Sequence, residues 1–276
     1  MNIALSALIL LLLAAPLHAQ SPFRTALPET AKGDKLYAAE RWSDALKEYS
    51  RLPSSPEVLK RMGAVQIKLW DMTSAIRSLR SAAKQVPTDM ETKGFLAEAL
   101  SWNKNFGEAA VLYKEVLASN DATTETRLSY ARMLSWMKDL DGAIEQYRLA
   151  IKRNPENLEG HKGLGQMLAW KKQFDQSITA YRRIVEITSV PEYKSVALAR
   201  IGQVQVWKGD VEAARSTYNA ALRLDPNNIE AMFGLGELNE WSGSYPEAKA
   251  LYEKILQVRP DHKAAKAKLV QLLWVK

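Results

Sequence analysis

The stretch 229–262 reads IEAMFGLGELNEWSGSYPEAKALYEKILQVRPDH, and its spacing decides the fold. A small residue, Gly236, lies in the first half, Ala248 follows 12 residues later, and the large Tyr252 follows 4 residues after that. Pro260 comes near the end of the stretch. The same marks recur upstream, mostly at an interval of 34 residues, which indicates an internal repeat rather than a single globular core.

Three columns of residues define this repeat. The small residues of the first column are Gly33, Gly63, Ala97, Ala131, Gly165, Gly202 and Gly236. Those 12 positions later are Ala45, Ala75, Ala109, Ala143, Ser177, Ala214 and Ala248. The large residues 4 positions further are Tyr49, Leu79, Tyr113, Tyr147, Tyr181, Tyr218 and Tyr252. Proline closes many repeats, at Pro87, Pro155, Pro226 and Pro260, because it cannot continue a helix.

The columns predict an all-α fold of seven helix-turn-helix repeats. A helix pair cannot bury its apolar face alone, so neighbouring pairs must stack into a solenoid with one continuous core. We expect a right-handed superhelix in which the final segment, 263–276, is a helix that caps the last repeat. The predicted repeats are 26–55, 56–89, 90–123, 124–157, 158–194, 195–228 and 229–262, with an insertion of three residues before Gly202.

The repeat resembles the tetratricopeptide repeat (TPR). The pairs Leu164-Gly165 and Leu235-Gly236, and the Ala248-x-x-x-Tyr252 spacing, match its signature closely, and 225–228 (Asp-Pro-Asn-Asn) is typical of its linkers. The resemblance covers nearly all of the chain after its first residues. It implies a concave surface, formed by the first helix of each repeat, on which partners bind.

Five of the eight tryptophans share one position, five residues after the small residue of their repeat. At 100° per residue they point away from the core stripe of the first helix, towards the expected concave face. The candidate binding residues on this face are Trp102, Trp136, Trp170, Trp207, Trp241, Arg132, Lys162, Gln166, Arg200, Gln203, Phe233 and Glu237.

Two interpretations of the tryptophan series stay open. Each ring can fold back against the neighbouring first helix as part of the core, or the row can form a stacking surface for a ligand. Five fully exposed tryptophans would form a larger apolar patch than soluble monomers normally show. The rings are therefore packed, used for binding, or partly both.

The expected function is a non-enzymatic scaffold that binds a protein partner in an envelope assembly. The alternative is direct binding of a polysaccharide or peptidoglycan strand by the tryptophan row. Endings such as Ser-Trp and Ala-Trp, followed by Lys-x-Phe or its variants, resemble repeats in envelope proteins of exopolysaccharide export. This resemblance implies an extended polymer as ligand, because sugars present apolar faces that stack on aromatic rings.

The first residues indicate export. The run from Ile3 to Ala15 is apolar except for Ser6, which is too short for a membrane span but suits a secretory signal. We expect a signal peptide over 1–19, a short segment over 20–25, and a periplasmic or secreted location. Any association with a membrane is then expected only through a partner. Export also argues against nucleic acid as a ligand, and the net charge of +7 is spread along the chain.

Enzymatic chemistry finds no support in the motifs. The chain has no cysteine, and His161 and His262 lie about three repeats apart, so we expect ordinary surface histidines, no metal site and no cofactor. The glycine-rich stretch 160–165 lacks the spacing of a phosphate-binding loop and is expected inside a helix. The recurring carboxylates Glu57, Glu91, Glu125, Glu159 and Glu230 are expected at helix starts, where they stabilise the macrodipole.

Overall fold

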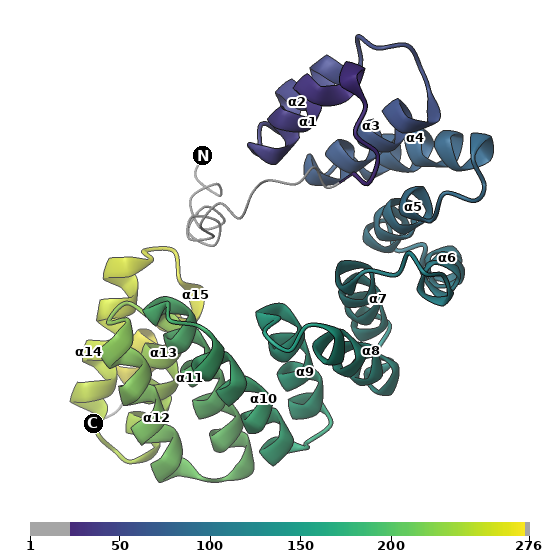
Figure 1. Ribbon diagram of the computed structural model, residues 1–276. Coiled ribbons are helices and arrows are strands. Elements are labelled where there is room, and N and C mark those ends of the chain that lie inside the picture. Colours follow the sequence, from purple (N-terminus) through teal and green to yellow (C-terminus); the bar gives the residue numbers. More distant parts are fainter. Residues whose placement is uncertain (1–22, 274–276) are drawn as a thin grey trace. The chain divides into compact units, whose positions relative to one another are not determined.

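The computed structural model describes residues 23–273 (Figure 1). The predicted signal peptide, residues 20–22 and the last three residues of the predicted capping segment lie outside this range. Within it every regular element is a helix, and the chain divides into two compact units at Ala122 and Thr123. The names unit 1 and unit 2 refer below to residues 23–122 and 123–273.

Unit 1 contains three helix pairs. Its elements are η1 (Pro28–Thr30), α1 (Ala31–Ala38), α2 (Trp42–Tyr49), α3 (Pro56–Lys68), α4 (Met72–Gln85), α5 (Met90–Trp102) and α6 (Phe106–Ala118). In each pair the two helices pack against one another, and α3 also contacts α5.

Unit 2 contains four helix pairs and a final single helix. Its elements are α7 (Thr124–Trp136), α8 (Leu140–Arg153), α9 (Leu158–Trp170), α10 (Phe174–Ile187), α11 (Pro191–Lys208), α12 (Val211–Leu224), α13 (Ile229–Trp241), α14 (Tyr245–Val258) and α15 (Lys263–Leu272). First helices contact one another, α7 with α9 and α11 with α13, more closely than second helices do. The last helix, α15, packs on α14, as the predicted cap should.

The three sequence columns form the core, as predicted. Every member of the Ala/Ser column is fully buried, and the large residues are at most 5% exposed. The small first-column residues are necessary because a Cβ atom on Gly165 would lie 2.9 Å from the ring of Tyr181, and one on Gly202 would lie 2.7 Å from that of Tyr218. Close approach of the paired helices therefore depends on glycine at these positions.

Local signals set the helix ends. The caps Ser55, Asp89, Thr123, Asn157 and Asn228 each accept a hydrogen bond from a backbone N–H in the first turn of the following helix. The carboxylates predicted at helix starts lie in the first turns. The four closing prolines each lie two residues beyond the end of a second helix.

The turn inside each pair has one backbone conformation in all seven repeats. The residue seven positions after the small residue has a positive φ, from 57° at Glu40 to 93° at Gly209. Five of these seven residues are not glycine. Since left-handed backbone is unfavourable for L-residues with a side chain, the repeat imposes this conformation on the sequence.

The sixth repeat corrects one predicted boundary. Counting back from Gly202 places its start at 195, but α11 begins at Pro191, so the boundary between 194 and 195 falls inside a helix of 18 residues. Pro191 occupies the first turn, where its missing N–H costs nothing. The insertion is therefore absorbed as additional helix.

The histidines also differ from the prediction. His161 is buried, with Nε2 2.9 Å from the carbonyl oxygen of Pro155. His262 caps α15, where its Nδ1 accepts a hydrogen bond from the N–H of Ala265 at 3.1 Å. Both have structural roles rather than the free surface positions expected of them.

A candidate binding face on the first helices

The tryptophans of unit 2 lie at the ends of its first helices and remain substantially exposed. The exposed fractions are 40% for Trp136, 50% for Trp170, 51% for Trp207 and 63% for Trp241. Complete burial in an inter-repeat core therefore does not occur in this unit. Each ring is partly packed and partly open to solvent.

Helix periodicity places these rings on a face with polar neighbours. On α9, Lys162, Gln166 and Trp170 are all exposed and lie four residues apart, whereas Met167 and Leu168 between them are buried. Residues four apart are neighbours on one side of a helix, so the three share a face. The structure therefore places these three candidate residues on one exposed face of α9, and their role in binding stays a prediction.

The same face continues on α7 and α11. On α7, Arg132 precedes Trp136 by one turn and lies 3.5 Å from the hydroxyl of Ser129. On α11, Arg200 and Gln203 precede Trp207, and Arg200 donates to Glu230 of α13 at 2.7 Å. Both partners of that ion pair are about half exposed, so the pair links two first helices at the surface.

Two of the predicted binding residues on α13 are less accessible to a ligand than expected. The ring of Phe233 lies 5.5 Å from that of Tyr252 and 5.8 Å from that of His262. Glu237 faces Lys268 of α15 at 3.8 Å, and burial raises the pKa of Glu237 although Lys268 opposes the rise. The final helix and the loop before it therefore cover part of this face, and Trp241 is the most open predicted residue of α13.

Lysines next to the tryptophans join successive repeats, a feature that the sequence prediction missed. Lys208 donates to Asp175 of α10 at 2.7 Å, and Lys171 forms the equivalent ion pair with Asp141 of α8. The hydrogen bond that Lys208 donates to Asp175 raises the pKa of Lys208. The signal was the Trp-Lys dipeptide at 170–171 and 207–208, with an aspartate 30 residues before Lys171 and 33 residues before Lys208, the difference being the insertion before Gly202.

Unit 1 presents its tryptophans differently. Trp102, at the shared position, is half-buried, and its ring meets that of Trp70 edge to face at 4.8 Å between centroids. Trp70 stands in the turn between α3 and α4 and was not among the predicted residues. It has the positive φ of that turn, at 62°, and is 68% exposed.

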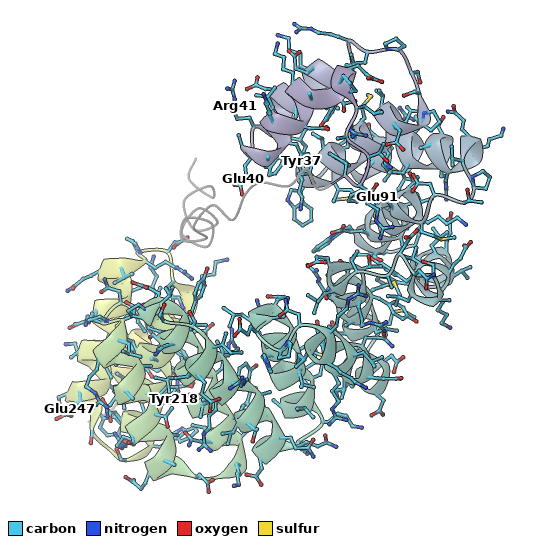
Figure 2. The ribbon with its side chains drawn as sticks, in the orientation of Figure 1. Tyr37, Glu40, Arg41, Glu91, Tyr218 and Glu247 are labelled. Carbon is cyan, nitrogen blue, oxygen red and sulfur yellow. The ribbon has the colours of Figure 1, made fainter. Side chains whose placement is uncertain are left out.

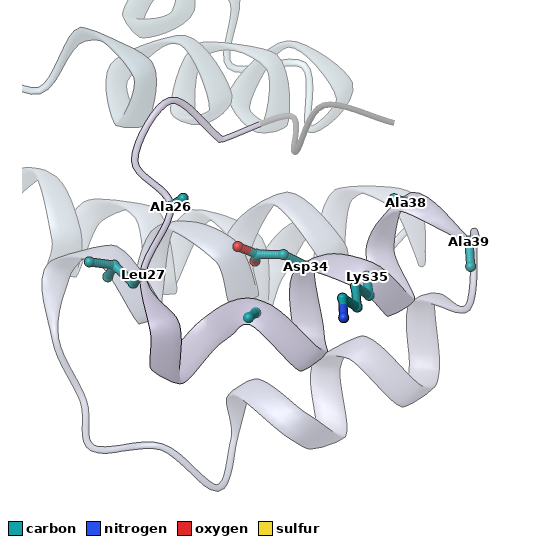
Figure 3. Close-up of a pocket in the computed structure, with 7 residues that line it drawn as sticks. Ala26, Leu27, Asp34, Lys35, Ala38 and Ala39 are labelled. Atoms are coloured by element: carbon teal, nitrogen blue, oxygen red, sulfur yellow. The ribbon is translucent and has the colours of Figure 1, made fainter. Parts of the chain in front are cut away.

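A pocket of about 460 Å³ lies beside α1 in unit 1 (Figure 3). Its lining is mostly alanine side chains, with Leu27, Lys35 and Asp34. The carboxylate of Asp34 is already engaged, because Tyr49 donates to it at 2.6 Å and Arg61 at 2.9 Å. The pocket thus offers little chemistry for a specific ligand.

Neither a metal-binding cluster nor a membrane-spanning helix occurs in the part of the chain that the structure describes. Residues 23–273 contain no group of three or more histidine or carboxylate side chains placed to hold a metal ion. No helix among them combines the length and the apolar character needed to cross a lipid bilayer.

Comparisons with known proteins identify the repeat. Two family models described as tetratricopeptide repeat match residues 137–190 and 208–272. No curated protein matches the whole sequence significantly.

Solved structures with the same fold are numerous but distant in sequence. The C-terminal part of a TPR repeat-containing protein from Cytophaga hutchinsonii is 15% identical, with a TM-score of 0.67 over 87% of this chain and 99% of that one. PilF of Pseudomonas aeruginosa is 14% identical, with a TM-score of 0.61 over 78% and 97%. YrrB, described as a TPR protein with an unusual peptide-binding site, is 18% identical, with a TM-score of 0.52 over 68% and 96%. The chain therefore contains tetratricopeptide repeats and has the all-α fold of TPR proteins, which in general are non-catalytic scaffolds for protein–protein interaction.

Proposed function

We propose that this chain is an exported, non-enzymatic scaffold that binds a protein partner on the first-helix face of unit 2, within an assembly of the cell envelope. The observation that carries the proposal is the tryptophan row, which occupies one repeat position and is 40–63% exposed in unit 2. The proposal of export rests on the apolar run at 3–15.

The neighbours of the rings favour a protein as the ligand. Tryptophan and arginine are the residues that most often dominate the binding energy of protein interfaces. On α11 they occur together, since Arg200 and Trp207 are both exposed. The exposed amide of Gln166 adds a group that can donate and accept hydrogen bonds to a peptide backbone.

A polysaccharide or peptidoglycan strand is the second candidate. The observation that favours it is the regular recurrence of one ring per repeat along successive first helices. An extended polymer with a repeating apolar face matches such a row, and each ring would contribute about 0.5–1.5 kcal/mol if aromatic stacking sets the scale.

Site-specific photo-crosslinking in producing cells tests the proposal. A benzophenone amino acid replaces Gln166, beside Trp170, and in a matched control replaces Thr179, which is exposed on the second helix α10. We expect a discrete protein adduct only from position 166, and its loss in the double variant Trp170→Ala/Trp207→Ala.

The other outcomes are equally informative. An adduct whose added mass is removed by a glycosidase would support the polysaccharide alternative. Adducts that form equally at both positions, or that persist without the two tryptophans, would contradict a binding site on this face.

A further inference from the structure

A short segment of the chain itself lies against the first helices of unit 1. Residues 23–25 precede η1 and contact α1, α3 and α5, which are the first helices of three consecutive repeats. Figure 2 labels two of the residues that they contact, Tyr37 on α1 and Glu91 on α5. Phe23 is only 3% exposed, although it belongs to no helix. The segment therefore occupies unit 1 on the helices that correspond to the tryptophan-bearing helices of unit 2.

The ring of Phe23 lies in an aromatic and cationic cradle. Its centroid is 5.2 Å from that of Tyr37 on α1 and 6.1 Å from that of Phe95 on α5. The guanidinium carbon of Arg61 lies 4.6 Å from the same centroid, within the range of a cation–π interaction. Three helices thus contribute to recognition of one aromatic side chain.

Side chains of the helices also bind the backbone of the segment. The N–H of Arg24 donates to Glu91 Oε1 at 3.1 Å, and the carbonyl oxygen of Thr25 accepts a hydrogen bond from Arg61. The guanidinium of Arg24 binds both the carboxylate and the carbonyl oxygen of Asp121, in the loop after α6. Recognition therefore combines an aromatic cradle, two backbone contacts and an acidic partner for arginine.

The binding groups are held in place by a buried network beneath the segment. Arg61 is fully buried and also donates to Asp34 at 2.9 Å and to Glu57 at 2.9 Å. Glu91 forms an ion pair with Lys60 at 2.8 Å. Because these ion pairs belong to the helices, Arg61 and Glu91 stay oriented towards the segment position whether or not a segment is bound there.

We propose that this surface of unit 1 is a second binding site, specific for an aromatic residue followed by arginine, and that Phe23-Arg24 occupies it as an intramolecular ligand. A partner protein with the same motif in a non-helical segment binds there after the chain's own segment has left. The site is independent of the tryptophans of unit 2, since it lies in unit 1 and uses none of those residues.

Tethering explains how the chain's own segment excludes a competitor. A ligand attached through a short linker has an effective concentration of the order of millimolar. Only Ala26 and Leu27 separate the segment from η1. A free peptide with the same motif must therefore bind weakly to the wild-type protein and more tightly once the tethered motif has been removed.

A labelled peptide with the sequence SPFRTA, residues 21–26, tests this prediction directly. We expect the double variant Phe23→Ala/Arg24→Ala to bind the peptide at least about 10-fold more tightly than the wild-type protein, which follows from the loss of the tethered competitor. A peptide with alanine in place of phenylalanine should lose this binding. Equal, weak binding by both proteins, with the helical circular dichroism retained, would overturn the proposal.

Limited proteolysis provides a test that leaves the core intact. Trypsin cleaves after Arg24, and the Arg24–Asp121 pair is 45% and 43% exposed, so Asp121→Asn removes the ion pair, leaves only the backbone carbonyl contact and removes no buried surface. The matched control is Glu108→Gln, which breaks the Arg80–Glu108 pair of similar exposure on α4 and α6. We expect cleavage after Arg24 to become several-fold faster only in Asp121→Asn. Unchanged cleavage in that variant would contradict docking of the motif.

Discussion

The position two residues before the small residue of the repeat is used differently on α3 of unit 1 and on α9 and α13 of unit 2. On α3 of unit 1 it is Arg61, which is fully buried and bound to two carboxylates. On α9 and α13 of unit 2 it is Gly163 and Gly234, whose backbones lie against the tyrosine of the preceding repeat. The same repeat frame thus supports a buried ionic network in unit 1 and close aromatic packing in unit 2.

This difference extends to the face that each unit presents. In unit 1 the ionic network holds Glu91 and Arg61 against the chain's own residues 23–25, which fill part of the surface. In unit 2 the tryptophan rings at the helix ends remain 40–63% exposed. The repeat specifies where a side chain lies, and the residue type decides whether that place is filled or open.

Removal of the buried arginine should have the largest effect on stability. Arg61→Ala leaves the carboxylate of Asp34 buried without its cationic partner, which typically costs about 3–5 kcal/mol. The matched control is Arg200→Ala at the same repeat position, where the exposed pair with Glu230 contributes about 0–1 kcal/mol. Chemical denaturation of both variants measures the difference. Equal losses of unfolding free energy in the two variants would show that burial does not distinguish the two arginines.

Addition of a methyl group at the corresponding glycine should have the next largest effect. Gly234→Ala places a Cβ atom within the ring of Tyr218, and overpacking of this kind costs about 1–3 kcal/mol. Gly107→Ala is the control, because that site has no atom within 4 Å of the new Cβ. A stability loss confined to Gly234→Ala confirms close aromatic packing. If Gly234→Ala were as stable as the wild type, the two helices would have room to separate.

Acid should weaken the α5 region of unit 1 before the α13 region of unit 2. Burial opposes ionisation of Asp89, but hydrogen bonds from Thr92 and Lys60 hold its pKa below the ordinary 3.8. The contribution of ionised Asp89 to the stability of the fold is therefore present above about pH 4, and it is lost as the pH falls through the lowered pKa. The pKa of Glu237 in unit 2 is raised, so acid has the opposite effect there, and protonation of Glu237 favours the folded state.

Hydrogen exchange between pH 6 and pH 3 compares the two regions. Protection at α5, corrected for the intrinsic exchange rate, should fall relative to protection at α13. Asp89→Asn keeps a side-chain cap but removes the charge, so it should flatten the pH dependence at α5. Parallel loss of protection at α5 and α13 would contradict this account.

The smallest expected effects lie in the turns. All three turns of unit 1 place a residue other than glycine in left-handed backbone, whereas two of the four in unit 2 use Gly209 and Gly243. Lys172→Gly should stabilise unit 2 by about 0.5–1 kcal/mol, because glycine tolerates this conformation. Gly243→Ala should destabilise unit 2, because alanine does not tolerate this conformation. Thermal denaturation of both variants checks the pair, and a destabilised Lys172→Gly would show that the lysine side chain makes a compensating contact.

The repeat frame could be read from the sequence because it depends on local spacing. Columns such as Gly165, Ser177 and Tyr181 recur at fixed intervals, and the structure buries all three. The start of the sixth repeat was misplaced because counting from Gly202 ignores Pro191, whose fixed backbone suits the first turn of a helix.

The buried charges could not be predicted in the same way. Lys60 and Arg61 are adjacent between the apolar residues Leu59 and Met62, and charged side chains in a helix ordinarily face solvent. Their partners Asp34 and Glu91 belong to the neighbouring repeats, and Asp89 ends their own repeat 29 residues after Lys60, so only the stacking of helices brings these groups together. The contacts of His262 with Phe233 and of Lys268 with Glu237 were not predicted for the same reason. Helix periodicity defines a face but not what lies against it.

The unfolding free energies of Trp170→Ala and Tyr181→Ala test the central claim most directly. Both residues belong to the same repeat, but Trp170 is 50% exposed and Tyr181 only 3%. We expect Tyr181→Ala to cost about 3–5 kcal/mol, as for a buried aromatic residue. Trp170→Ala should cost only about 1–2 kcal/mol, since roughly half of its surface never leaves water. Equal losses would mean that the tryptophan row is core, and the binding face proposed for unit 2 would lose its basis.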